Sequence, residues 1–255
     1  MLRLYLRLVG VQFRSKAHYR VSFVFEVLST AMIVLFEFGS LGLAFERFET
    51  LKGWNLAEVA FLYGSVELAF GVMDMLFSGF DPPYFSNLVR KGTFDQLLLR
   101  PVDITLQVLG ADFAVRRMGK IALGAAIFGV ALALNPIQWT VWKVLYIPVV
   151  VGSMVCFFGG LFIAGAALTF WTVESFETIN IFTYGGSMVI AHPMHIYQNW
   201  LRGFFTYVLP AIFLNFYPAL YILGKPDPLG FPAFAPFLSP FVGLGVLAAA
   251  LAFWR

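Results

Sequence analysis

Charged residues are scarce in this chain, and their scarcity excludes an ordinary soluble domain. Only 12% of the 255 residues are charged, 60% are hydrophobic, and the mean hydropathy is +0.82. A soluble domain carries about 25% charged residues, because its surface must face water. Lipid solvates apolar side chains directly, so the composition indicates an integral membrane protein. The aromatic content of 18% is typical of spans with aromatic belts at the membrane interfaces.

Several chemical motifs are also missing. The single cysteine, Cys156, cannot form an intrachain disulfide. There is no G-x-x-x-x-G-K-[ST] phosphate loop, no convincing Ser-His-Asp or Cys-His set, and no H-E-x-x-H motif. His192 and His195 flank a proline and lack further ligands for a metal. We therefore expect no nucleotide site, no metal and no cofactor on this chain. The net charge of +3 gives no sign of nucleic-acid binding, because the basic residues cluster at helix ends.

Long apolar runs dominate what remains. A spanning helix needs about 20 predominantly apolar residues. Six runs qualify, at about Val21–Phe45, Val59–Phe80, Ala114–Leu134, Val144–Val173, Gly203–Gly224 and Phe237–Trp254. The sequence therefore predicts an all-α membrane protein with six transmembrane helices, in a single domain covering residues 1–255.

The segment from Thr178 to Tyr197 is ambiguous. It is uncharged, but it holds Asn180, Gly185-Gly186, Pro193 and two histidines. Non-helical backbone at membrane depth survives only against protein or a water-filled cavity. We favour a broken or interfacial helix here over a seventh full span.

Lys and Arg residues set the orientation. With six spans, most of the 17 basic residues, Arg202 and Arg255 among them, fall on the side of the N-terminus. The other side keeps only Arg47, Lys52, Lys143 and Lys225. The positive-inside rule then predicts that both termini are cytoplasmic.

Residues 1–20 carry a charge pattern of their own. Arg3, Arg7 and Arg14 fall near one helical face, with Leu4 and Leu8 beside them. This pattern favours an amphipathic helix lying on the cytoplasmic membrane surface, in contact with lipid. The alternative is a plain charged extension.

The largest polar block lies between the second and third runs, from Asp81 to Lys120. A membrane protein with such a block in one internal loop is expected to meet a soluble partner there. In this block Leu97, Leu98 and Leu99 are able to press a short helix into a groove, and Pro101 would end that helix. The alternative is a solvated loop whose basic residues only obey the topology rule.

Three segments together resemble the ABC-2-type permeases, and more narrowly a bacterial branch of poorly characterised export permeases. The first is the loop from Leu88 to Pro101, with its glycine, aspartate and Leu-Leu-Leu-Arg-Pro. The second is Phe182–Met188, and the third is Trp200–Arg202 leading into Asn215–Tyr221. Each piece alone is weak, but their order along the chain is more specific.

The resemblance implies six spans, an N-terminal interfacial helix, and a cytoplasmic coupling helix at residues 82–103. It implies that two permease subunits, identical or related, pair and dock on a dimer of ATP-binding subunits that hold ATP and Mg²⁺. This chain would be a non-catalytic subunit in the bacterial inner membrane, exporting an amphipathic drug, lipid or glycan-lipid. The residues expected to couple it to the ATPase are Arg90, Lys91, Phe94, Asp95, Leu97, Leu98 and Arg100.

Acidic residues inside the first two spans form a second candidate site. Glu37 lies deep in the first span, and Glu67 and Asp74 share one face of the second. A charge near the bilayer centre costs about 2.5 kcal/mol or more, so these groups should face protein or water. They bond helices together, are protonated carboxyls, or form a polar wall of the substrate path or the dimer seam. The alternative function is a proton-coupled secondary transporter with the three acids as relay, although no inverted repeat is visible.

Overall fold

A computed structural model describes residue 10 and residues 20–172 and 179–255. The expected interfacial helix over residues 1–20 lies almost wholly outside the described residues. The described part is all-α, and the only β-type pairing in it is one isolated bridge between Leu51 and Trp54. The prediction of an all-α membrane protein is confirmed.

Within the described residues, five helices are long and apolar enough to cross a membrane. They are α2 (Arg20–Arg47), α3 (Leu56–Leu76), α7 (Met118–Leu134), α8 (Val141–Leu168) and α13 (Ser239–Trp254). Short 3₁₀ turns, η2 (Val115–Arg117) and η7 (Ala235–Leu238), precede α7 and α13 and complete the two spans Val115–Leu134 and Ala235–Trp254. These elements correspond to the first, second, third, fourth and sixth predicted spans.

Shorter helices fill the two connections. Between α3 and α7 lie η1 (Ser78–Phe80), α4 (Pro82–Arg90), α5 (Thr93–Leu98) and α6 (Ile104–Leu109). Between α8 and α13 lie η3 (Ile181–Gly185), α10 (Gly186–Ile190), η4 (Met194–Ile196), α11 (Asn199–Gly203), η5 (Phe204–Val208), η6 (Ala211–Phe213) and α12 (Phe216–Leu223).

Side-chain caps fix where two of the long helices begin. The Asn55 side chain accepts a hydrogen bond from the Glu58 backbone, and the Glu58 carboxylate accepts one from the Asn55 backbone, each at 2.9 Å. This capping box satisfies two otherwise unpaired amides at the start of α3. The Thr140 hydroxyl accepts from the Lys143 backbone at the start of α8 in the same way.

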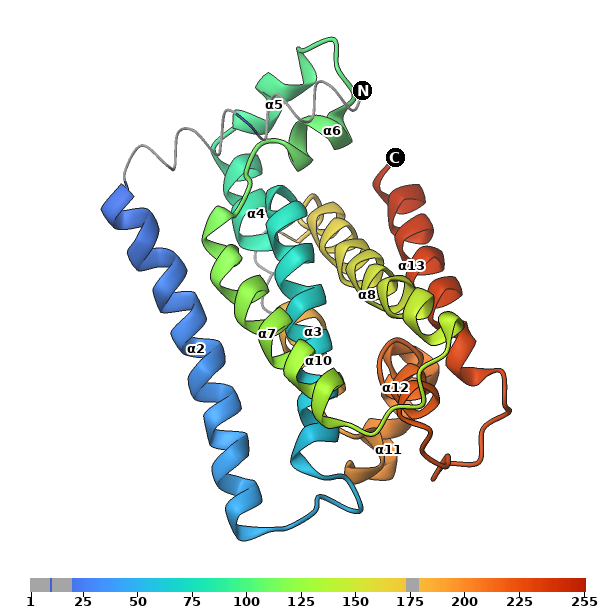
Figure 1. Cartoon of the computed structure of the whole chain (residues 1–255). Helices are drawn as coiled ribbons and strands as arrows, with labels where there is room; N and C mark the ends of the chain where they lie inside the picture. The colour runs from blue at the N-terminus through green and yellow to red at the C-terminus, as the bar shows by residue number, and fades with distance from the viewer. Residues whose placement is uncertain (1–9, 11–19, 173–178) are drawn as a thin grey trace.

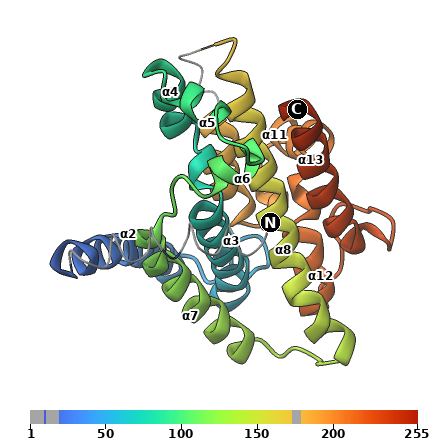
Figure 2. The same cartoon turned by 90° about the horizontal axis from the view of Figure 1, so that it is seen from above.

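Glycines let the long helices pack closely in two pairs, α3 with α7 and α8 with α13 (Figures 1 and 2). A Cβ on Gly64 of α3 would lie 2.6 Å from the Phe128 backbone, and one on Gly124 of α7 would lie 2.7 Å from the Leu68 backbone. A Cβ on Gly243 of α13 would clash with the Ser153 backbone of α8. Small residues at such contacts are what helix packing in lipid requires, because burial of apolar surface adds little there.

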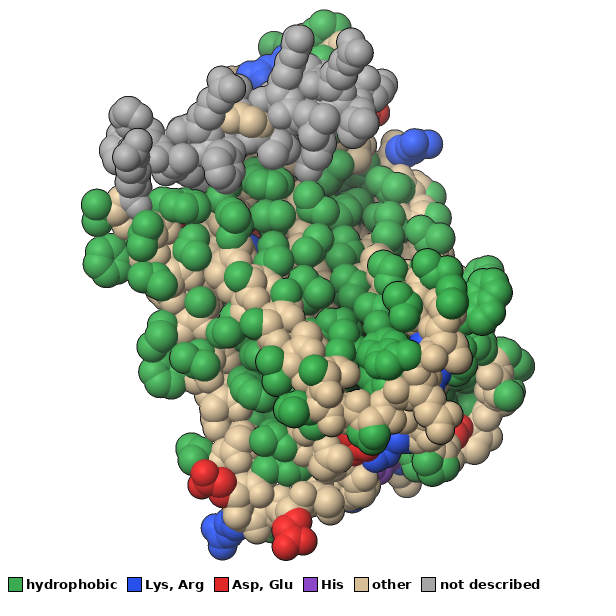
Figure 3. All heavy atoms as spheres, in the orientation of Figure 1, with side chains coloured by type: hydrophobic (Ala, Val, Ile, Leu, Met, Phe, Trp, Pro, Cys, Tyr) green, Lys and Arg blue, Asp and Glu red, His purple; other side chains and the backbone are tan. Residues whose placement is uncertain are grey.

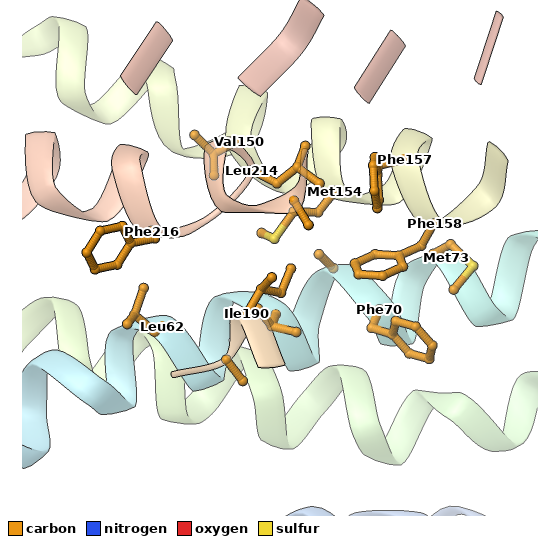
Figure 4. Packing of buried hydrophobic residues seen from close by; sticks show 14 of the residues in the cluster. Leu62, Phe70, Met73, Val150, Met154, Phe157, Phe158, Ile190, Leu214 and Phe216 are labelled. Carbon is orange, nitrogen blue, oxygen red and sulfur yellow. The ribbon is translucent and has the colours of Figure 1, made fainter. Parts of the chain in front are cut away.

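The core lies where α3, α8, α10 and the segment around Leu214 meet, as Figure 4 shows. Phe70, Met73, Met154 and Phe158 are almost fully buried there. The Phe70 and Phe158 rings meet edge-on, with centroids 5.2 Å apart. These contacts join the two helix pairs into one bundle.

Helix α2 stands at the edge of this bundle (Figures 1 and 2). Only 6% of its most apolar 18-residue window is buried, against 78% for α3, and it packs mainly on α7. Hydrophobic side chains cover the middle of the face in Figure 3, and the charged ones visible there lie nearer its ends. This distribution is typical of a surface solvated by lipid.

The fifth crossing is not where the sequence predicted it. Residues 199–223 form two helical pieces, Asn199–Val208 and Ala211–Leu223, that bend by 81°. On one flank of this pair, the Lys52 ammonium donates to the His195 carbonyl at 3.4 Å. On the other flank, Lys225 donates to the Gly53 carbonyl at 2.9 Å. Both flanks therefore meet the loop between α2 and α3, and the pair is a re-entrant hairpin. The prediction of a fifth span at about Gly203–Gly224 is wrong, because both ends of the pair lie at the same end of the bundle.

The segment that traverses the bundle instead is 179–196. Ile179 and Pro82 both lie against Gly165 of α8, whereas His195 lies beside Trp54, with ring centroids 6.3 Å apart. The segment thus covers the whole depth that α3 covers between residues 80 and 54. It does so with a π-turn and a short helix whose inner face, including Thr183, Ser187 and Ile190, is buried against protein, as irregular backbone at this depth requires. The described residues therefore cross six times, and the C-terminus lies at the same end as α4–α6 (Figure 1).

Asn215 holds the inner part of the hairpin in place. Its fully buried side chain donates to the Leu62 and Ile190 carbonyls at 3.1 and 2.9 Å, and Ser65 bonds its amide oxygen at 2.8 Å.

We call the two ends of the bundle the α4–α6 end and the α11–α12 end. The hairpin places Arg202 at the α11–α12 end, opposite to the side expected, and the excess of basic residues at the α4–α6 end remains.

Candidate functional site

The connector, residues 81–117, projects from the α4–α6 end of the bundle (Figure 1). It is three short helices rather than the single coupling helix expected from the sequence. Gly92 separates α4 from α5 with a φ of 67°, a left-handed conformation that glycine adopts without strain. Helix α5 ends at Leu98, before Pro101, as predicted.

Two polar contacts fasten the connector to itself and to α3. The Ser78 hydroxyl, just after α3, donates to the Asp112 carbonyl at 2.9 Å. The buried Gln107 amide donates to the Leu97 and Val102 carbonyls at 3.1 and 2.8 Å. The turn after α5 therefore has a fixed shape rather than that of a freely moving loop.

An aromatic cluster ties the connector to α8 and α13. Its members are Phe80, Phe85, Phe94, Phe170 and Trp254. The Trp254 ring lies 5.4 Å from Phe85 and 6.4 Å from Phe94, so the last turn of α13 contacts both α4 and α5. Phe94 also lies 5.2 Å from Phe170, which follows α8. The cluster thus joins α4 and α5 to α8 and α13 at once.

The sequence-predicted coupling residues separate into two groups. Phe94 is buried in the aromatic cluster, and Leu97 is half-buried against the core. Leu98 and Leu99 are 52% and 86% exposed. The charged residues around them are also exposed: Arg90, Lys91, Asp95 and Arg100. The outer surface of the connector is therefore an apolar pair surrounded by charge.

The two acids of α3 each have a basic partner. Glu67 Oε2 lies 3.0 Å from Lys120 Nζ, and Asp74 Oδ2 lies 2.6 Å from Arg117 Nε. Both carboxylates are almost completely buried. The shared face of Glu67 and Asp74 thus points toward α7 and η2, and its charge is balanced there.

Glu37 of α2 is placed differently. Its carboxylate accepts a hydrogen bond from the Tyr63 hydroxyl at 3.1 Å, and within the described residues it has no basic partner. A cleft of about 390 Å³ opens beside it, between α2, α3, α7 and α10. Lys120, Ser187 and His192 line the same cleft, so Glu37 and Glu67 share it.

Asp81 occupies the junction between α3 and the connector. Burial raises the pKa of the Asp81 carboxyl to about 6, and the nearby negative charge of Asp74 adds to this effect. The Oδ1 atom has no hydrogen-bond partner within the described residues. The carboxyl is therefore poorly solvated when ionised.

Comparison with known families gives a single decisive result. A sequence model described as "ABC-2 family transporter protein" matches residues 30–255. This chain belongs to the ABC-2 transporter family. It has no match among the curated proteins or among the solved structures. As an ABC-2 protein it is a multi-pass membrane permease component of an ABC transporter.

Sequence reasoning on this ABC-2 protein missed the basic partners of the buried acids. Arg117 and Lys120 were placed with the cytoplasmic basic residues, whereas they reach Asp74 and Glu67 within the bundle. A usable signal was present, because the two basic residues are three apart at the start of the third span, as expected for one helix face. Nothing in the sequence indicated the role of Trp254, because only the tertiary fold brings the last turn of α13 to the connector.

Proposed function

We propose that this ABC-2 protein is the permease subunit of an exporter, with ATP and Mg²⁺ bound and ATP hydrolysed on a separate dimer of ATP-binding subunits. The observation that carries the proposal is the exposed Leu98-Leu99 pair on a connector fastened to three spans. Exposed apolar side chains ringed by charge are typical of protein contact sites. The pair would enter a groove on the ATP-binding subunit, and Arg90, Lys91, Asp95 and Arg100 would set the register.

The transmission route follows from the anchors. Closure of the ATP-binding dimer would displace α4 and α5, and the aromatic cluster would pass that displacement to α8 and α13. Ser78 links the other side of the connector to α3. Such a movement of helix pairs past one another is a known means of switching cavity access.

The remaining parts of the proposal concern assembly and location. A second permease subunit, identical or related, would complete the membrane part, and the exposed flank of α2 leaves room for it. The excess of basic residues at the α4–α6 end supports cytoplasmic termini and a bacterial inner membrane location. The substrate would be amphipathic: a drug, a lipid or a glycan-lipid. The proton-relay alternative has less support, because Glu67 and Asp74 each have a basic partner at 3.0 Å or less.

Co-purification tests the proposal. The chain is expressed with its neighbouring genes and isolated through a tag, and ATPase activity is measured in liposomes. We expect a stoichiometric ATP-binding subunit with the wild type. Leu98→Glu combined with Leu99→Glu should remove that subunit, because it places two charges in the apolar contact.

Phe48→Glu is the matched control. Phe48 is 61% exposed in the loop at the opposite end, so the same charge insertion there should leave the complex intact. A complex that survives the double leucine substitution with full ATPase activity would contradict the assigned contact. A wild-type chain that purifies without any ATP-binding subunit would contradict the proposed function itself.

A further inference from the structure

The three intramembrane acids, grouped together by the sequence, have different electrostatic surroundings. Glu67 and Asp74 are neutralised by Lys120 and Arg117 at 3.0 and 2.6 Å. Glu37 has only the neutral Tyr63 hydroxyl, at 3.1 Å. Within the described residues, the acids and bases around the cleft therefore leave one negative charge without a counter-ion, and that charge belongs to Glu37.

We propose that the cleft binds the cationic headgroup of an amphipathic substrate, with Glu37 as its counter-ion. This inference rests on the proposed function and deepens it by naming the substrate class. An unpaired carboxylate in a medium poorer than water gains from any cation that reaches it. An anionic headgroup would instead meet Glu37 and Glu67. It would find Lys120 and Arg117 already engaged, and one nitrogen of the His192 ring bonded to the Met188 carbonyl at 3.0 Å.

The shape of the cleft suits a headgroup with an attached apolar tail. Its volume of about 390 Å³ lies near the lower end of ligand pockets, which are roughly 300–1,000 Å³. Ile33 and Met188 line it and are 58% and 60% exposed, so the rim belongs to the lipid-facing surface. A tail would remain in lipid beside this rim while the headgroup enters.

The walls offer further contacts for a cation. The Tyr63 and Tyr184 side chains both line the cleft, and aromatic rings attract cations through their faces. Lys120 already uses this interaction, with its ammonium 4.8 Å from the Phe70 ring centre. Helix α2 packs mainly on α7 and only lightly on α3, so the cleft is able to widen on that side.

Binding of a defined probe to the purified transporter in nanodiscs tests the proposal. The probe is radiolabelled dodecyltrimethylammonium, with empty nanodiscs as background and dodecyl sulfate as the anionic competitor. We expect saturable binding to the wild type and no competition by dodecyl sulfate. Glu37→Gln keeps the size of the side chain and should raise the dissociation constant about tenfold, as loss of a charge-assisted contact does.

Glu26→Gln is the control, because Glu26 is an exposed acid on the same helix outside the cleft. It should bind the probe like the wild type. Equal binding by Glu37→Gln, or equal competition by dodecyl sulfate, would overturn the proposal. An effect of Glu37→Gln on permease pairing alone would also overturn it and assign Glu37 to the subunit seam.

A second measurement leaves Glu37 in place, in case its replacement prevents assembly. Ile33→Cys on a Cys156→Ala background puts a reactive thiol at the rim. Dodecyltrimethylammonium should slow its modification by a neutral thiol reagent, and dodecyl sulfate should not. Equal rates with both surfactants would contradict a cation site.

Neither assay needs ATP hydrolysis. A transporter with full ATPase activity that does not bind the probe would overturn only this inference. Absence of an ATP-binding subunit would overturn the proposed function, and the binding result on the permease alone would still be readable.

Discussion

Arg117 Nε lies 2.6 Å from Asp74 Oδ2, so the end of the connector is joined to α3 inside the bundle. The Asp74 side chain is 3% exposed and that of Arg117 is 21% exposed. At this burial, removal of one partner leaves a charge that neither water nor a counter-ion stabilises. The pair therefore fixes the base of the connector against α3, where movement would have to enter the membrane.

Replacement of Arg117 should destabilise the fold, because it leaves the buried Asp74 carboxylate without its counter-ion. We expect Arg117→Met to lower the free energy of unfolding by about 3 kcal/mol, and Asp74→Leu combined with Arg117→Met to recover most of that loss. Thermal unfolding followed by size-exclusion fluorescence measures both. Arg116→Met is the control, because Arg116 is exposed. A single variant as stable as the double variant would show that the pair contributes nothing.

Replacement of Trp254 should loosen the connector. Trp254→Ala removes a ring that contacts both α4 and α5, and we expect a loss of about 2 kcal/mol because the side chain is only half-buried. Hydrogen–deuterium exchange should quicken across residues 82–98. Trp171→Ala is the matched control at the same end, since Trp171 is 69% exposed and stacks only on Phe253 in the described part. Unchanged exchange in Trp254→Ala would exclude the cluster as an anchor.

The re-entrant hairpin predicts an unusual labelling pattern. On a Cys156→Ser background, a cysteine at Asn199 should react with a membrane-impermeant reagent from the same side as one at Phe48. A cysteine at Leu99 should react only from the opposite side. A full span over residues 203–224 would instead put Asn199 and Leu99 on the same side. Labelling of intact cells and of inverted vesicles distinguishes the two topologies.

The pKa of Asp81 predicts how stability depends on pH. Burial raises this pKa from an ordinary value of 3.8 to about 6, so between these values the folded state binds the proton more tightly than the unfolded state. Stability should therefore fall as the pH rises from 4 to 6. The side chain introduced by Asp81→Asn cannot ionise, so this variant does not lose stability as the pH rises. It should be more stable than the wild type at pH 7.5 by about 1 kcal/mol, a figure reduced for partial exposure.

The same comparison at pH 4 should show almost no difference between Asp81→Asn and the wild type. Asp95→Asn, at an exposed position of the connector, should change stability little at either pH. A gain in Asp81→Asn that is equal at pH 4 and pH 7.5 would point to packing rather than to ionisation.

Apolar length predicted five of the six crossings, because lipid-facing helices must be long and uncharged. It failed at residues 199–223 and 179–196, where protein rather than lipid surrounds much of the backbone. Pro210 and Asn215 interrupt the apolar run at the turn of the hairpin, and Asn215 bonds to α3 and α10. Hydropathy does not distinguish a hairpin from a crossing; the contacts of its flanks with Lys52 and Gly53 do.

The candidate site was predictable only in part. The position of the connector and the shared face of Glu67 and Asp74 follow from sequence spacing alone. The exposure of Leu99 and the burial of Phe94 do not, because they depend on where Trp254 and Phe170 arrive from distant parts of the chain. The contrast between Glu37 and the two paired acids likewise needs the positions of Arg117 and Lys120.

Because α2 is long, its tilt in the membrane should depend on the thickness of the bilayer. Its 28 residues extend about 42 Å, whereas the hydrocarbon core is about 30 Å thick. A helix longer than the hydrocarbon it crosses tilts to fit, and α2 is held to the bundle mainly along α7. Thinner membranes should therefore incline α2 further and change the width of the cleft beside Glu37. The lipid composition would then act on the transporter as an effector does.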